Sequence, residues 1–107
     1  ITAEEFAKIH ENEKPLTIDI SKKSEFQSQH ITDAVNIPLN EINNHLAEFP
    51  KDKPFILHCA GGYRSMIAAS MLKQRGWDNF SDVIGGFTEI AKTNVPKSEY
   101  ICPSTML

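Results

Sequence analysis

The sequence predicts an α/β domain with a largely parallel sheet, because segments with strand and helix patterns alternate along most of the chain. Short runs rich in β-branched and apolar residues, bounded by turn residues, predict the strands. The expected strands span residues 16–20, 34–37, 55–59 and 80–84. Helical segments are expected just after Thr2 and over residues 24–29, 40–49, 65–75 and 87–92.

The first helix and the first strand have clear local signals. Thr2 lies three residues before Glu5, so the two side chains can form a capping box at the start of a helix. The strand over residues 16–20 then follows Pro15 and brings Asp19 close to the carboxyl end of the strand. In parallel sheets that edge is where ligands bind.

Proline residues mark the limits of the middle elements. Pro38 closes the strand over residues 34–37. Apolar residues recur at helical spacing over residues 40–49, and Pro50 and Pro54 then frame a turn before the next strand.

The helix over residues 65–75 has both a start and a stop signal. Ser65 is the expected N-cap, and Gly76 is the expected C′ residue after the last turn. One face of this helix is expected to pack inward through Ile67, Ala68, Met71 and Leu72.

The bulk composition favours one ordinary globular domain over residues 1–107. With 107 residues and a net charge of −3, the chain has no basic excess that would attract nucleic acid. It has no apolar run near the ~20 residues needed to cross a bilayer, so no membrane partner is expected. Two cysteines are too few for a disulfide framework, which favours a reducing, cytoplasmic location. The first residue is Ile1 rather than methionine, so a domain excised from a longer chain, with a covalently fused partner domain, is also an expectation.

The residues expected to take part in catalysis lie in the segment 55–65. Its strand ends at Cys59, which enters a glycine-bearing loop that opens the next helix. Gly61 and Gly62 tolerate the positive φ values with which backbone N–H groups curl around an anion. A helix start of this kind favours the thiolate form of cysteine, so Cys59 is the expected nucleophile. Cys102 has no such surroundings and is expected to be structural.

The length of the loop favours sulfur over phosphorus as the atom handled. Four residues separate Cys59 from Arg64, one fewer than in the similar loops of tyrosine phosphatases, which encircle a phosphate. A smaller ring suits a sulfur atom carried on the cysteine. A phosphatase or an arsenate reductase is therefore disfavoured.

This loop resembles the active loop of the rhodanese family, which reads roughly Cys-x-x-Gly-x-Arg-Ser/Thr. The similarity covers nearly the whole chain, through the motifs Ile18-Asp19-Ile20-Ser21, Glu25-Phe26, His30-Ile31, Ala34-Val35-Asn36-Ile37-Pro38 and Val83-Ile84-Gly85-Gly86-Phe87. The resemblance implies a three-layer domain with a mainly parallel central sheet and helices on both faces. It also implies a catalytic Cys59 that carries sulfur as a persulfide, with substrate-binding or loop roles for Ala60, Gly61, Gly62, Tyr63, Arg64 and Ser65.

A rhodanese-type sulfurtransferase would take sulfur from thiosulfate or a persulfide donor and pass it to a thiol or cyanide acceptor, without a cofactor or metal. Two positions differ from the common family pattern: Ser21 stands where arginine is frequent, and Ala60 where a basic residue often follows the nucleophile. Arg64 is then the main cation of the loop. Thiosulfate is therefore expected to bind weakly and a persulfide donor to be used better.

Several alternatives remain open at the level of sequence. Arg64 either binds an anionic donor or ties the loop to a carboxylate, and Asp19 is a supporting residue, as the partner of Arg64 or as an acceptor that organises the loop. His58 precedes Cys59 on a strand, so the two side chains are expected on opposite faces of the sheet.

The function has an alternative of a different class. The chain would then be a non-catalytic or regulatory rhodanese-like module attached to a partner enzyme domain. Residues 59–70 and 100–105 are also similar to rhodanese domains fused behind metallo-β-lactamase-fold hydrolases.

Overall fold

A computed structural model describes residues 1–100 of the chain. The structural role expected for Cys102, and the similarity noted over residues 101–105, lie outside the described residues. The elements are α1 (Ala3–Glu13), β1 (Leu16–Asp19), α2 (Lys23–Ser28), β2 (Val35–Asn36), η1 (Leu39–Asn44), η2 (Leu46–Glu48), β3 (Phe55–His58), α3 (Tyr63–Gln74), β4 (Phe80–Asp82) and α4 (Gly86–Ile90). Across residues 1–100, every helix is too short or too polar to cross a membrane.

The four strands form one parallel sheet in the order β2-β1-β3-β4. β1 and β3 pair along their whole lengths, with Leu16 opposite Phe55 and Asp19 opposite His58. Their carboxyl ends therefore meet at one edge. The predicted α/β class and parallel sheet are confirmed, and the strand ends differ from the expected ones by one or two residues.

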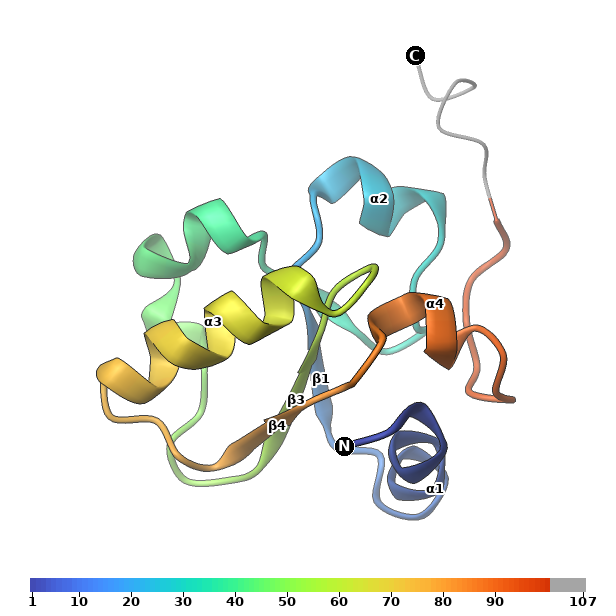
Figure 1. The fold of residues 1–107 in the computed structure, drawn as a ribbon, viewed down its shortest axis with the longest axis horizontal. Coiled ribbons are helices and arrows are strands. Elements are labelled where there is room, and N and C mark those ends of the chain that lie inside the picture. Colours follow the sequence, from blue (N-terminus) through green and yellow to red (C-terminus); the bar gives the residue numbers. More distant parts are fainter. Residues whose placement is uncertain (101–107) are drawn as a thin grey trace.

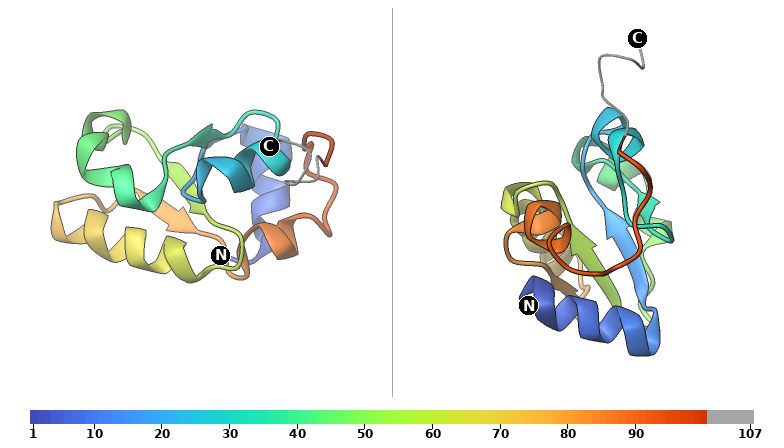
Figure 2. Two further views of the ribbon diagram at one scale, coloured as in Figure 1. Left: turned by 90° about the horizontal axis from the view of Figure 1, so that it is seen from above. Right: turned by 90° about the vertical axis from the view of Figure 1, so that its right-hand side faces the viewer.

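Helices cover both faces of the sheet, which confirms the predicted three layers (Figure 1). Side chains alternate along β3, so Phe55 and Leu57 pack with α3 and the 3₁₀ segments, whereas Ile56 packs with α1 and α4. Figures 1 and 2 show α1 at the opposite end of the molecule from α2, which follows the carboxyl end of β1.

Local capping explains the limits of α1 and the end of α3. Thr2 accepts a hydrogen bond from the Glu5 backbone and Glu5 reaches back to Thr2, so the predicted capping box is confirmed. At the C-terminal end of α3, Gly76 has φ 95°. Its N–H donates to the carbonyl oxygen of Lys73, and the N–H of Trp77 donates to the carbonyl oxygen of Leu72. This pair of bonds is a Schellman motif, and it confirms Gly76 as the C′ residue.

The predicted start of α3 at Ser65 is wrong. The helix begins at Tyr63, and Gly62 is its N-cap, with φ 92°. This left-handed conformation turns the chain into the helix without any capping side chain. Ser65 lies one turn inside, and its hydroxyl is 3.2 Å from the carbonyl oxygen of Gly62.

The segment expected to be helical over residues 40–49 consists of two 3₁₀ helices. Its turns are closed by bonds between residues three apart, such as His45 N–H to the Ile42 carbonyl. Asparagine side chains compete with the helical backbone for hydrogen bonds, and this segment contains Asn40, Asn43 and Asn44. Burial of Ile42 holds the segment on the sheet nonetheless.

Candidate active site

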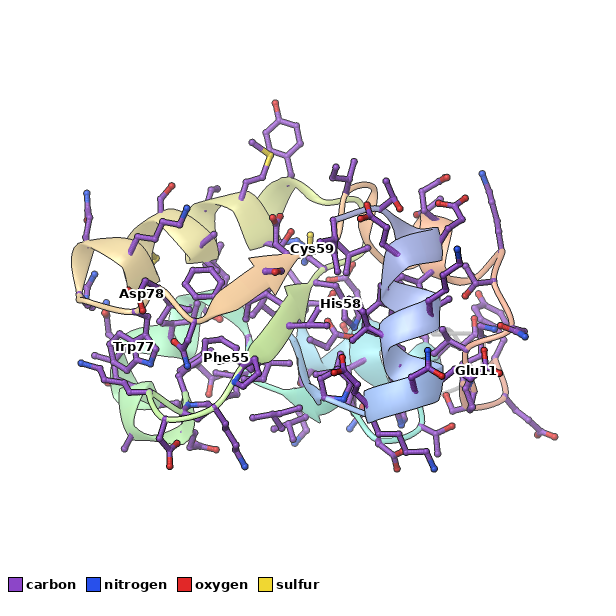
Figure 3. The ribbon with its side chains drawn as sticks, turned by 90° about the horizontal axis from the view of Figure 1, so that it is seen from below. Glu11, Phe55, His58, Cys59, Trp77 and Asp78 are labelled. Carbon is purple, nitrogen blue, oxygen red and sulfur yellow. The ribbon has the colours of Figure 1, made fainter. Side chains whose placement is uncertain are left out.

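Cys59 lies directly after β3, at the carboxyl edge of the sheet, and its side chain is fully buried. In Figure 1 the loop that it opens lies between α2 and α4. Figure 3 shows Cys59 beside the start of α3, with Trp77 near the far end of that helix. The expected place of the cysteine, between a strand and a helix, is therefore the place that the fold gives it.

Two backbone N–H groups of the loop and helix point at the sulfur. The N–H of Gly62 is 3.0 Å from Cys59 Sγ and the N–H of Ser65 is 3.4 Å from it. Both belong to the first turn of α3, where unpaired N–H groups carry partial positive charge. The site can therefore hold a negative sulfur atom without a cation beside it.

Only one of the two loop glycines is needed for its backbone conformation. Gly62 has a positive φ, but Gly61 does not, and a Cβ on Gly61 would meet nothing within 4 Å. The prediction that both glycines supply positive φ values is therefore wrong for Gly61. Ala60 contributes through its backbone, because its carbonyl oxygen accepts bonds of 3.0 Å from both the N–H and the hydroxyl of Thr88.

The second glycine pair of the chain, Gly85 and Gly86, packs against the backbone of the loop. Gly86 has φ 59°, and a Cβ there would overlap the carbonyl oxygen of Cys59. The adjacent Phe87 N–H donates to that same oxygen at 2.7 Å. The sequence signal for this contact is the Gly85-Gly86 motif, which the resemblance noted without giving it a role in the loop.

Ser65 joins the loop to the neighbouring strand. Its buried hydroxyl is 3.1 Å from Oδ2 of Asp82, at the end of β4. Sequence reasoning missed Asp82, because nothing local links it to a loop 17 residues earlier.

Tyr63 projects into solvent, with 82% of its surface exposed. Ile67, which was expected to pack inward, is also exposed, whereas Ala68 and Leu72 on the same helix are buried.

Arg64 is tied to a carboxylate, which is one of the two roles that the sequence left open. Its guanidinium forms two bonds to Glu25 of α2, Nη1 to Oε1 at 2.5 Å and Nη2 to Oε2 at 3.0 Å. The Lys22 N–H also donates to Oε1. The bonds from Arg64 lower the pKa of Glu25, and the bonds to Glu25 raise the pKa of Arg64. Both groups are therefore charged near neutral pH, and the charge of Arg64 is already compensated.

Of the two supporting roles left open for Asp19, the structure shows that of an acceptor, while Arg64 pairs with Glu25 instead. Oδ1 of Asp19 accepts the N–H of Ser21 at 2.9 Å, which makes Asp19 an acceptor that organises the end of β1. Its Oδ2 lies 3.9 Å from Nε2 of His58 on the neighbouring strand.

His58 supports the loop from the other face of the sheet. Its ring stacks on Phe87 of α4, while Cys59 packs with the cluster under α3, so the predicted opposite orientation of the two side chains is confirmed. Nδ1 of His58 is 3.3 Å from the carbonyl oxygen of Cys59, which can only accept a hydrogen bond. Burial lowers the pKa of His58, and the nearby Asp19 carboxylate offsets this only in part, so the ring is neutral near pH 7.

Comparison with known proteins gives one consistent family. The model of the rhodanese-like domain family matches residues 2–93. A protein named sulfurtransferase from Allochromatium vinosum is 29% identical over 89 residues, which are 83% of each chain. A protein named thiosulfate sulfurtransferase GlpE from Pseudomonas syringae is 32% identical over 75% of this chain and 74% of its own. The crystal structure of a rhodanese-related protein from Thermoplasma volcanium is 30% identical, has a TM-score of 0.79 and is matched over 92% of this chain and 95% of its own.

Proposed function

The chain belongs to the rhodanese-like domain family, and from this we propose that it is a sulfurtransferase that carries a sulfur atom as a persulfide on Cys59. The observation that carries the proposal is the pair of N–H groups, from Gly62 and Ser65, that point at Cys59 Sγ at the start of α3. Similarity to proteins named sulfurtransferases supports the same reaction class.

The reaction has two halves. In the first, the Cys59 thiolate attacks the outer sulfur of the donor, a new S–S bond forms, and the donor's own S–S bond breaks. The leaving group takes the bonding electron pair, as sulfite from thiosulfate or as a thiolate from an organic persulfide. In the second half, a thiol or cyanide attacks the outer sulfur of Cys59, and the Cys59 thiolate leaves with the electron pair.

The N–H groups at the start of α3 act in both halves. They stabilise the negative sulfur of the thiolate before transfer and the terminal sulfur of the persulfide after it. The cradle closes over four residues between Cys59 and Arg64, which suits one added sulfur atom better than a tetrahedral phosphoryl group.

An organic persulfide fits this site better than thiosulfate does as the donor. Thiosulfate carries two negative charges, and the guanidinium of Arg64 is already held by both oxygens of Glu25. Ala60 supplies no cation beside the nucleophile. A persulfide has less charge to compensate at its reacting end, so it needs no free cation here.

Intact-protein mass spectrometry tests the proposal directly. The protein is incubated with thiosulfate or with glutathione persulfide, and the expected product is heavier by one sulfur atom. A protein that gains no sulfur from either donor would contradict the proposal. Hydrolysis of p-nitrophenyl phosphate that is lost in Cys59→Ser would do so as well, because it would show phosphate chemistry at the same cysteine.

A further inference from the structure

Asp82 is an acidic residue beside the active loop that the proposed reaction does not use. It ends β4, and its carboxylate lies 3.1 Å from the buried hydroxyl of Ser65. The amino group of Ile1 donates to the backbone carbonyl of the same residue, 2.9 Å away. Neither half of the reaction involves this carboxylate, although it lies against the first turn of α3.

Ser65 connects the carboxylate to both N–H groups that point at the sulfur. Its own N–H is 3.4 Å from Cys59 Sγ, and the N–H of Gly62 is 3.0 Å from the same atom. The Ser65 hydroxyl is also 3.2 Å from the Gly62 carbonyl oxygen. This hydroxyl has a single proton, and a carbonyl and a carboxylate can both only accept it. The charged acceptor forms the stronger bond, so Asp82 anchors Ser65 to β4.

The carboxylate also acts on the sulfur through space. Ser65 contacts both groups, so the carboxylate and Cys59 Sγ lie within about 10 Å of each other, and partly buried charges at this distance are screened little by salt. A like charge disfavours the ionised form of its neighbour. The N–H groups at the start of α3 favour the thiolate, and Asp82 opposes them.

Other charged or titratable groups surround the loop, and they have partners of their own. The pairs are Arg64 of α3 with Glu25 of α2, Asp19 of β1 with His58 of β3, and Glu89 of α4 with Lys92. The side chain of Asp82 differs from these, because within residues 1–100 its partner is the neutral hydroxyl of Ser65. Its charge is therefore left to act on the loop.

We propose that Asp82 is a positioning residue that sets how strongly the loop holds negative charge on Cys59, and that it thereby balances the two halves of the reaction. This inference rests on the proposed sulfurtransferase function. A more basic thiolate attacks a donor faster, but it leaves more slowly when an acceptor attacks the outer sulfur of the persulfide. Because Asp82 disfavours the thiolate, it speeds the attack by Cys59 and slows its departure.

The first test measures the ionisation of Cys59 without any sulfur transfer. The ultraviolet absorbance of the thiolate is recorded against pH in a Cys102→Ser background, and the Cys59→Ser form of that background is the blank. Asp82→Asn can keep the hydrogen bond to Ser65 but loses the charge. The midpoint of its titration should fall by about 0.5–1 pH unit, the effect of one like charge at this distance.

Two variants separate the charge of Asp82 from its structural role. Asp82→Glu keeps the charge, so its midpoint should stay closer to that of the parent than the midpoint of Asp82→Asn does. Asp78 is exposed and lies beyond the end of α3 that is far from Cys59, so Asp78→Asn is the matched control and should leave the midpoint unchanged (Figure 3). An unchanged midpoint in Asp82→Asn, or an equal fall in Asp78→Asn, would overturn the proposal.

The two half-reactions give a second readout, which a merely structural role would not move in the same way. At a pH where Cys59 is ionised in both proteins, Asp82→Asn should gain sulfur from glutathione persulfide about two- to threefold more slowly than the parent and pass it to cyanide about two- to threefold faster. Intact-protein mass spectrometry follows both steps. Slowing of both steps would indicate lost structure and would overturn the proposal. If the parent gains no sulfur, the proposed function fails, while the absorbance titration still decides whether Asp82 controls the charge on Cys59.

Discussion

A guanidinium that holds both oxygens of a carboxylate has little free charge to offer an anion, and Arg64 is in this position through its pair with Glu25. The pair is about one-third exposed, so its contribution to stability is about 1 kcal/mol at most. In the proposed reaction we expect a larger effect on substrate choice, because the pair compensates the main cation of the loop. Glu25 would then disfavour strongly anionic donors.

Releasing Arg64 from Glu25 should change that selection. In Glu25→Gln the guanidinium keeps a neutral partner but gains a free charge, so the KM for thiosulfate should fall severalfold, most clearly at low ionic strength. Steady-state kinetics with thiosulfate and cyanide measure this. Glu11→Gln, on the exposed face of α1 far from Cys59, removes the same charge and should leave the KM unchanged (Figure 3). A fall of equal size in both variants would assign the effect to net charge alone.

The proposed sulfur transfer also depends on the sulfur atom of Cys59. Cys59→Ser should abolish persulfide formation, because a hydroxyl is not a comparable nucleophile at neutral pH. Cys102→Ser should retain most of it. Mass spectrometry of the two variants after incubation with glutathione persulfide measures this, and equal losses would indicate a relay between two cysteines instead.

At the level of elements, the active loop is shaped by two glycine pairs that meet in space. Gly62 is the N-cap of α3 and Gly86 begins α4, and a Cβ on Gly62 would lie 3.1 Å from the backbone nitrogen of Gly85. The start of α4 therefore presses against the loop and donates hydrogen bonds to its first two carbonyls. The geometry around Cys59 is thus a property of α3 and α4 together.

A single methyl group should disturb this contact at one glycine and be tolerated at another. Gly86→Ala combines a positive φ with a Cβ that overlaps the Cys59 carbonyl, so we expect a loss of unfolding free energy of about 1–3 kcal/mol and slower persulfide formation. Gly61→Ala has open space and an ordinary φ, and should change both by little. Urea unfolding and mass spectrometry compare the two. Similar losses in both variants would mean that the loop, rather than its contact with α4, is the sensitive part.

The elements that the sequence predicted well are those fixed by neighbouring residues. The capping box of Thr2 and Glu5 and the Gly76 stop signal depend on bonds within a few residues, and both are present. The start of α3 was misplaced because a serine is the commoner N-cap, whereas here the contact with Gly85 favours a glycine.

The parts of the site that the sequence missed are contacts between distant segments. Arg64 and Glu25 are 39 residues apart, and the sequence offered only Asp19 as a possible partner of Arg64. Register decides between them: Asp19 lies opposite His58 in the sheet, while Glu25 lies on the helix that follows β1. A reading of local spacing cannot supply that geometry.

At the level of the whole molecule, the buried ring of His58 joins the loop after β3, α4 and β1 at the carboxyl edge of the sheet. On one side it contacts the Cys59 carbonyl and Phe87, and on the other it faces Asp19 of β1. Its Nε2 has no hydrogen-bond partner among the described residues. Protonation would place a charge in this dry layer, with only a carboxylate at 3.9 Å to compensate it.

The stability of the fold should therefore fall as the pH is lowered. The folded pKa of His58 lies below its ordinary value of 6.5, so between the two values the unfolded chain binds a proton that the folded chain does not. Stability is then highest above pH 6.5 and is lost below it, by at most about 1.4 kcal/mol per pH unit for one proton. Urea unfolding between about pH 7.5 and 5 measures this slope, and His58→Phe, which keeps a ring against Phe87, should reduce it. Glu25→Gln is the matched control, because the lowered pKa of Glu25 contributes stability that is lost only below its ordinary value of 4.5. A slope that is equally steep in His58→Phe would show that the pH dependence comes from other groups.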